Sequence, residues 1–317
     1  MALPDFLVIG APKAGSTALH AALAQHPRLV ASDPKEPKYF MCADRPPEPA
    51  GQRGPGDAHS AQEWIWQRGQ YARLFDGAPP GTLTFESTPF YLWDRRAHLR
   101  IAQTVPDAKL IAVIRDPLDR AFSNWTHLWV DGLEPVGSFR RAVELEPQRV
   151  AAGWAPFWRY LELGRYGEQL AHLFSVVDRE RVHVVRYRRL VDSPAETLAA
   201  LYDFLGVPGS DVLSVPGSNV KQWSPDTTAN SLLRRLVRLG AAAGAYAPPQ
   251  VWRRAQQPLL DVLQRGGADR PGLSREDREA FLGHFRDDVH LLSDLLDEDY
   301  TDWLSPTGRG TYTVRRS

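Results

Sequence analysis

The sequence predicts an α/β fold with a central, mainly parallel β-sheet of about four to five strands. Short runs of aliphatic and β-branched residues recur along the chain, and segments with helical spacing separate them. The runs span residues 6–9, 82–86, 109–114 and 182–187. Alternation of strand and helix favours βα units, because parallel strands need a crossover connection between them.

The first strand passes through a small turn into a helix, within the stretch FLVIGAPKAGSTALHAAL that begins at Phe6. Gly10 and Gly15 allow close approach of the backbone, and Lys13 adds a positive charge. Unpaired N–H groups in the first turn of a helix favour an anion. The residues expected to hold it are Ala14, Gly15, Ser16 and Thr17. A glycine turn that serves only tight packing is the alternative.

A positively charged residue, Arg115, directly follows the third predicted strand. Arg115 follows residues 109–114, Asp116 opens a helix, and Ser123 lies two turns further along that helix. Neighbouring parallel strands end over one crevice, so we expect Arg115 to approach the anion held by the first loop. Alternatively, Arg115 is a structural arginine paired with Asp116 or Asp119.

A candidate base lies in the segment DPKEPKYF, which follows the first helix. Pro34 and Pro37 restrict the backbone around Lys35 and Glu36, so Glu36 is expected to return toward the mouth of the first loop. A carboxylate beside lysines stays ionised and can accept a proton. An ordinary surface charge cluster would have the same composition.

Several of these segments together resemble the sulfotransferases that use 3′-phosphoadenosine 5′-phosphosulfate (PAPS). The likeness is to the branch that contains heparan sulfate sulfotransferases and many bacterial enzymes. It rests on FLVIGAPKAGSTALHAAL, KEPKYF, FESTPFYL and VIRDPLDRAFSNW, in that order, and RYRRLVDSPAETLAALYDFLGV extends it to about Val207. The resemblance implies a P-loop-like, three-layer α/β/α domain.

The resemblance also implies a reaction. A sulfuryl group would pass from PAPS to a hydroxyl of a small-molecule, glycoside or carbohydrate acceptor, leaving adenosine 3′,5′-bisphosphate (PAP), with no metal. In this scheme Lys13 stabilises the leaving phosphate, and the loop residues 14–17 hold the phosphosulfate. Glu36 is the general base that deprotonates the acceptor during in-line attack on sulfur.

The rest of the donor site is assigned by the same resemblance. Arg115 and Ser123 match the contacts to the 3′-phosphate. Tyr187 stands where relatives place a tyrosine near adenine, although a packing role fits it too. In some relatives a loop late in the sequence covers the nucleotide, and Lys221 is the candidate residue for that role here. Ser87 and Thr88 replace a lysine-bearing version of this segment that is common among the heparan enzymes, which speaks against a polyanionic glycan as acceptor.

Two other functions remain open at this point. A P-loop kinase would place a lysine where Ser16 follows the last glycine, and it would need an acidic Mg²⁺ ligand after an apolar strand. A non-catalytic nucleotide-binding protein of the same fold would have no use for a carboxylate at Glu36. Both features favour the sulfotransferase.

Composition narrows the partners. Of the charged residues, 38 are Lys or Arg and 38 are Asp or Glu, so no net field favours nucleic acid. Cys42 is the only cysteine, which excludes an intramolecular disulfide and fits a reducing compartment. No apolar stretch reaches the length of a membrane span. We therefore expect a cytoplasmic protein, and the sequence leaves its oligomeric state open.

The chain is expected to form a single domain over residues 1–317. A Pro/Gly-rich loop at about residues 45–58 is either a lid or a plain surface loop, and the part from about residue 229 is helical. Ser193 and Glu196 form a predicted capping box for a helix that ends at Gly206. Another long helix is predicted from near Ser274 through Leu296.

Overall fold

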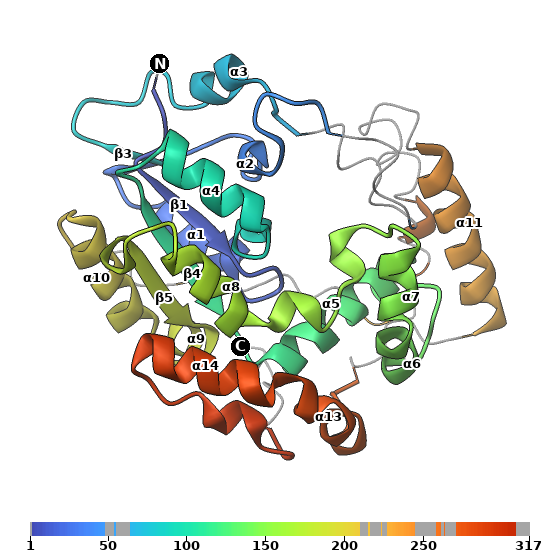
Figure 1. The fold of residues 1–317 in the computed structure, drawn as a ribbon. Helices are drawn as coiled ribbons and strands as arrows, with labels where there is room; N and C mark the ends of the chain where they lie inside the picture. Colours follow the sequence, from blue (N-terminus) through green and yellow to red (C-terminus); the bar gives the residue numbers. More distant parts are fainter. Residues whose placement is uncertain are drawn as a thin grey trace. The chain divides into compact units, whose positions relative to one another are not determined.

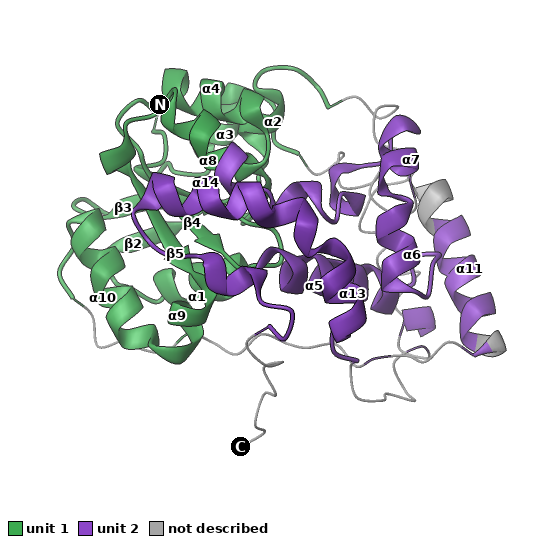
Figure 2. Cartoon of the chain, turned by 60° about the horizontal axis from the view of Figure 1, so that its bottom comes forward, with its two compact units in different colours: residues 1–47, 63–115, 169–219 green, residues 48–62, 116–168, 220–317 purple. Residues whose placement is uncertain are grey.

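The computed structural model describes residues 2–47, 54, 64–209, 215, 223, 227–244, 258–260, 263 and 271–308. Residue contacts divide the chain into two compact units, which Figure 2 shows in green and purple. The first unit comprises Met1–Pro47, Glu63–Arg115 and Gln169–Asn219, and the second comprises Glu48–Gln62, Asp116–Glu168 and Val220–Ser317. The expected single domain stays a prediction.

The first unit is built on a five-stranded sheet in which all neighbouring strands are parallel (Figure 1). Its strands are β1 (Phe6–Gly10), β2 (Leu29–Ala31), β3 (Leu83–Ser87), β4 (Lys109–Ile114) and β5 (Val182–Arg186). Their order across the sheet is β2-β3-β1-β4-β5, which places β1 in the middle. The predicted fold class is confirmed.

Both faces of the sheet are covered, which explains why its strands read as unbroken apolar runs. Every residue of β1 is buried. Phe6 and Val8 point to the face that packs on α1 (Ser16–Leu23) and α10 (Pro194–Leu205), whereas Leu7 and Ile9 point to the other. Phe6 lies beside Phe85 of β3 in register, and the two rings stack with centroids 4.7 Å apart.

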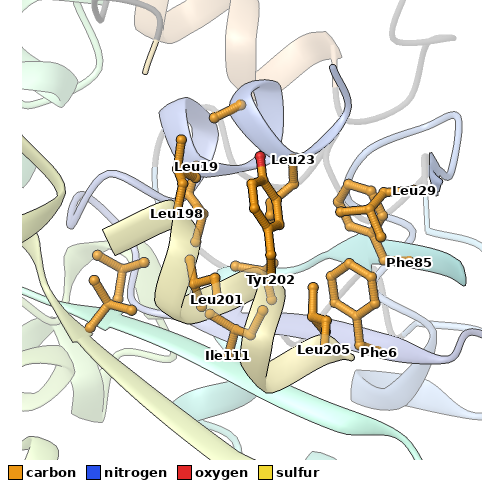
Figure 3. Close-up of a cluster of buried hydrophobic side chains, with 14 of the residues drawn as sticks. Phe6, Leu19, Leu23, Leu29, Phe85, Ile111, Leu198, Leu201, Tyr202 and Leu205 are labelled. Atoms are coloured by element: carbon orange, nitrogen blue, oxygen red, sulfur yellow. The ribbon is translucent and has the colours of Figure 1, made fainter. Parts of the chain in front are cut away.

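Figure 3 shows the core on the first of these faces. The helix α10 contributes Leu198, Leu201, Tyr202 and Leu205, which recur at the spacing of one helical face. They meet apolar side chains of α1 and of the strands, among them Leu19, Leu23, Leu29, Phe85 and Ile111. This cluster fixes α1, and therefore the loop before it, on the sheet.

Shorter helices complete the first unit. They are α2 (Tyr39–Cys42), α3 (Arg68–Arg73), α4 (Arg95–Thr104) and α9 (Tyr187–Asp192), and Pro89–Leu92 forms a 3₁₀ turn. Asp94 caps α4 by accepting a hydrogen bond from the Arg96 amide at 2.9 Å. A Cβ at Gly10 would lie 2.5 Å from Leu92 Cβ, so only glycine fits at the end of β1. The helix α8 (Tyr166–Phe174) begins in the second unit and ends in the first.

The second unit contains helices and no strand among its described residues. These helices are α5 (Pro117–Val130), α6 (Phe139–Glu144), α7 (Glu146–Ala151), α11 (Thr228–Gly244), α13 (Arg275–Leu282) and α14 (Arg286–Leu296). A buried ion pair supports the unit, in which Glu134 accepts hydrogen bonds from Arg149 at 2.7 and 2.8 Å and another from Tyr160. Among the described residues, no helix is both long and apolar enough to cross a membrane.

The predicted capping box is wrong. The helix α10 does begin after Ser193 and ends at Gly206, which adopts a positive φ of 76°. The Ser193 side chain, however, accepts no hydrogen bond from the first turn. The preceding helix α9 ends at the same residue, and the Thr197 hydroxyl donates to the Ser193 carbonyl at 2.8 Å. The backbone of Ser193 therefore serves two helices at once.

The long helix predicted from Ser274 to Leu296 is divided in two. Ser274 caps α13 as its sequence suggests, accepting from the Asp277 amide at 3.0 Å. A 3₁₀ turn at Gly283–Phe285 then separates α13 from α14. Glycine inside a helix weakens it, which is the physical reason for a break there.

Candidate active site

The candidate site lies along one edge of the sheet, where the parallel strands of the first unit end. The segment after β1 is the loop of residues 11–15, and residues 32–38 follow β2. Ser87 ends β3, Arg115 follows β4 directly, and Tyr187 follows β5 directly. After β1 the chain continues to β2 on one side, and after β4 it continues to β5 on the other. Such a reversal of direction opens a crevice at the strand ends.

The loop between β1 and α1 has the conformation of an anion-binding turn. Lys13 and Gly15 both adopt positive φ angles, of 65° and 98°. Gly15 is the N-cap of α1, and no side chain caps that helix. The helix therefore presents the amides of its first turn, beginning at Ser16, to any anion at its end. The Ala14 amide, in contrast, donates to the Ala11 carbonyl at 3.1 Å within the loop.

Tyr187 joins this loop to Arg115. A Cβ built on Gly15 would lie 2.8 Å from Tyr187 Cδ2, so the ring rests directly on the loop. Tyr187 also contacts Arg115, whose guanidinium carbon lies over the same ring, 4.9 Å from its centre. Stacking on an aromatic ring holds a guanidinium without using its N–H donors. The structure thus brings Gly15, Tyr187 and Arg115 together.

Glu36 is connected through Lys35 to the first turn of α1, which follows this loop. The Lys35 ammonium is 2.7 Å from Glu36 Oε1 and donates to Thr17 Oγ1 at 3.1 Å. The Lys35 carbonyl accepts from the Ser87 amide at 3.1 Å, which ties this segment to the end of β3. The Glu36 side chain keeps 34% of its surface exposed. Glu36 is thus linked through Lys35 to Thr17 in the first turn of α1, and its predicted role at the loop stays a prediction.

A neutral pair lies beneath the site. Nδ1 of His20 on α1 and Oγ of Ser87 on β3 are 2.8 Å apart. Burial, reinforced by the charge of Lys35, lowers the pKa of His20 to about 4, although Glu36 opposes this shift. The imidazole is therefore neutral near pH 7. Because its partner Ser87 has only a hydroxyl, neither side chain of the pair is charged.

Sequence reasoning missed Glu86, the residue before Ser87. Its side chain is fully buried and accepts hydrogen bonds from Thr88 at 2.8 Å and from Tyr71 at 3.2 Å. Burial raises the pKa of Glu86 to about 8, so the acid is mostly neutral at pH 7. Thr88 also accepts from the Lys38 amide at 3.3 Å. Glu86 therefore supports the segment that carries Glu36. In the sequence, the signal that could have identified Glu86 is an acidic residue inside an apolar strand.

Ser123 lies on α5 in the second unit and is buried. Asp116 caps this helix, accepting from the amides of Leu118 and Asp119 at 3.0 and 3.1 Å. Arg278 of α13 contacts both carboxylates, at 2.6 Å to Asp116 and 3.2 Å to Asp119. The two acids considered as partners of Arg115 are thus engaged by Arg278. The role of Ser123 stays a prediction.

Two predicted features lie outside the described residues. Lys221 is one of them. The Pro/Gly-rich loop at residues 45–58 is described only at residues 45–47 and 54. The choice between a lid and a surface loop therefore stays open.

Known proteins similar to this chain include heparan sulfate sulfotransferases. Human heparan sulfate glucosamine 3-O-sulfotransferase 3B1 is 29% identical over 205 residues, which cover 65% of this chain and 46% of the relative. Human heparan sulfate glucosamine 3-O-sulfotransferase 6 is 31% identical over 207 residues, which cover 64% of this chain and 52% of the relative. The chain thus spans about half the length of these curated relatives.

A solved structure extends the likeness to nearly the whole chain. The crystal structure of a sulfotransferase from Alicyclobacillus acidocaldarius matches with a TM-score of 0.73 and 26% identity, covering 96% of this chain and 100% of the other. A sequence model of the sulfotransferase family matches residues 4–211, the span that carries the loop, Glu36, Arg115 and Tyr187. The chain belongs to the sulfotransferase family.

Proposed function

We propose that this protein transfers a sulfuryl group from PAPS to a hydroxyl of an acceptor, with Glu36 as general base. The observation that carries the proposal is the order of chemical groups along the edge of the sheet. The anion loop follows the central strand β1, Arg115 and Tyr187 follow β4 and β5 on one side, and Glu36 follows β2 on the other. In-line transfer needs this order of leaving group, sulfur and base.

The donor side has the residues that a nucleotide phosphosulfate requires. Lys13 and the first-turn amides at Ser16 and Thr17 supply positive charge and hydrogen-bond donors for the phosphosulfate. The Arg115 guanidinium, held by its stack on Tyr187, keeps its donors for the 3′-phosphate. Ser123 is proposed from the family resemblance alone.

The base side performs the other half of the reaction. Glu36 accepts the proton of the acceptor hydroxyl as the acceptor oxygen bonds to sulfur. The bond between sulfur and the bridging oxygen breaks, and its electron pair leaves with the phosphate of PAP. Lys13 stabilises the charge that develops on that oxygen, which lowers the barrier more than it strengthens ground-state binding.

The acceptor is proposed as a small molecule, a glycoside or a carbohydrate. The names of the two human relatives reported above describe sulfation of a glucosamine oxygen, which supports a hydroxyl acceptor. The pair of His20 and Ser87 beside Glu36 is uncharged near pH 7. This pair therefore adds no cation that would attract a polyanionic chain, which supports a neutral acceptor.

Paired titrations with PAP and adenosine 5′-monophosphate test the donor assignment. We expect PAP to bind at least about a hundredfold more tightly, because two charge-assisted contacts to the 3′-phosphate contribute roughly 1.5–3 kcal/mol each. Arg115→Ala should remove most of that preference, whereas Arg73→Ala, which changes an exposed arginine at the end of α3, should keep it. Equal affinities in the unaltered protein would refute the assignment.

A transfer assay with labelled PAPS tests catalysis itself. Sulfated product should form from a panel of hydroxylated acceptors, and the rate should persist in the presence of a chelator, since no step uses a metal. A P-loop kinase would stop under those conditions. PAP binding without transfer to any acceptor would instead favour a non-catalytic nucleotide-binding protein.

A further inference from the structure

The Lys35 ammonium occupies a position that the proposed reaction leaves unassigned. It donates to Thr17 Oγ1 in the first turn of α1, next to the anion loop, and to Glu36 Oε1 on the proposed base. One charged group thus touches both the donor side and the acceptor side of the site. Its side chain retains 23% of its surface exposed, so solvent or a ligand can reach it.

The backbone holds Lys35 firmly in this place. Its carbonyl accepts from the Ser87 amide at 3.1 Å, and prolines stand on either side of the Lys35-Glu36 pair. Its charge also acts on the surroundings, since it contributes to the lowered pKa of His20 on α1. One ligand can therefore contact both the loop and the Lys35 ammonium without a large movement of either.

An ammonium carries three N–H donors. Within the described part of the chain, two of them are taken by Thr17 and Glu36. A phosphosulfate bound at the loop would place its sulfuryl oxygens between Thr17 and Glu36, because the acceptor must reach sulfur from the side of the base. The charge of that anion then attracts the ammonium in competition with Glu36.

We propose that Lys35 binds the sulfuryl group of PAPS and, by turning from Glu36 toward that group, leaves the carboxylate ready to take the acceptor's proton. This inference rests on the proposed function. Before donor binding, the ion pair holds Glu36; after it, the sulfuryl oxygens compete for the same ammonium. The base thus becomes available only when a group to transfer is present. PAP lacks the sulfuryl group and leaves the pair intact.

The test compares the affinities of PAPS and PAP, without acceptor, for the unaltered protein and Lys35→Met. We expect PAPS binding to weaken about tenfold or more, because a charge-assisted contact is lost, while PAP binding changes less than about twofold. Lys38→Met is the matched control. Lys38 lies in the same segment, but its ammonium is over the Trp64 ring, 5.4 Å from the ring centre. It should keep the ratio of the two affinities.

A second pair of variants removes the effect of leaving Glu36 without its cation. Lys35→Met is compared with the unaltered lysine in a Glu36→Gln background, where no carboxylate can repel the donor. The PAPS affinity should still fall about tenfold relative to PAP. Lys35→Arg, which retains the positive charge, should recover part of the preference.

The outcomes separate this inference from the proposed function. An unchanged ratio of PAPS to PAP affinity in both backgrounds, with transfer still present in the unaltered protein, would overturn the role of Lys35 alone. Equal weakening of PAP and PAPS would also overturn it, because Lys35 would then only support the loop. Failure of the unaltered protein to bind PAP would refute both.

Discussion

Glu36 combines an ion-pair partner with access to solvent. One of its carboxylate oxygens contacts Lys35, and about a third of the side chain is exposed, at 34%. The partial exposure leaves room for an acceptor hydroxyl to approach.

Glu36→Gln should therefore bind PAP with nearly unchanged affinity and transfer sulfuryl groups roughly 10²–10⁴ times more slowly, since the amide keeps the shape but cannot take a proton. Single-turnover rates and calorimetric titration of the same preparation measure the two effects. Glu180→Gln, at an exposed position in the turn before β5, is the control for amide substitution. A normal rate in Glu36→Gln would direct the search for the base to His20.

The buried acid Glu86 gives a prediction about pH. Its pKa in the folded chain is raised to about 8 from the ordinary value of 4.5, so the folded state binds its proton more tightly than the unfolded state does. The associated stability is fully present below the unfolded pKa and is lost as the pH rises toward and through 8.

Glu86→Gln keeps a neutral group in place, so the free energy of unfolding of this variant should depend less on pH. Between about pH 5 and 8, the free energy of unfolding of the original protein should fall relative to the variant by up to about 1.4 kcal/mol per pH unit. Urea unfolding at a series of pH values measures the difference. Parallel curves would mean that Glu86 is ionised in the folded protein.

At the scale of elements, the loop between β1 and α1 depends on glycine for two separate reasons. Gly15 has a φ of 98°, and a Cβ there would also meet the Tyr187 ring at 2.8 Å. Gly77 has a similar φ of 83°, but no atom lies within 4 Å of its Cβ position. The second glycine therefore isolates the cost of the backbone conformation.

Gly77→Ala should cost only the left-handed strain, about 1–2 kcal/mol, and leave PAP binding intact. Gly15→Ala should be more destabilising and should also weaken PAP binding, because Tyr187 must leave its place between the loop and Arg115. Urea unfolding and PAP titration of both variants test this. Intact PAP affinity in Gly15→Ala would contradict the proposed role of the Tyr187 contact.

The elements differ in how well the sequence predicts them. The strands β1, β3, β4 and β5 are predictable because sheets covered on both faces require long apolar runs. The strand β2 has only three residues, Leu29–Ala31, which is too short for a periodic signal. Ser193 satisfies the pattern of a capping box, but the end of α9 at that residue overrides it. Local patterns fail where two elements share a residue.

For the whole molecule, topology explains which parts of the site the sequence predicts. Arg115 and the anion loop are predictable as neighbours, since they follow parallel strands that end at one edge. The contact of Lys35 with Thr17 is not, because it depends on the bond that the Ser87 amide makes to Lys35 from a distant strand. The sequence marks Glu86 as an acid in an apolar strand, but it does not predict its partner Tyr71, which lies in a separate helix. These contacts are set by tertiary packing.

The division of labour along the sheet edge has a practical consequence for engineering. Segments after β2 and β3 carry Glu36 and its supports, whereas those after β4 and β5 carry Arg115 and Tyr187. Under the proposed function, exchange of residues 32–42 and 87–92 among related chains should change the acceptor while Arg115 and Tyr187 are retained, provided that the exchanged segment keeps Lys35 and Glu36. Diversification by exchange of such segments needs no redesign of the scaffold.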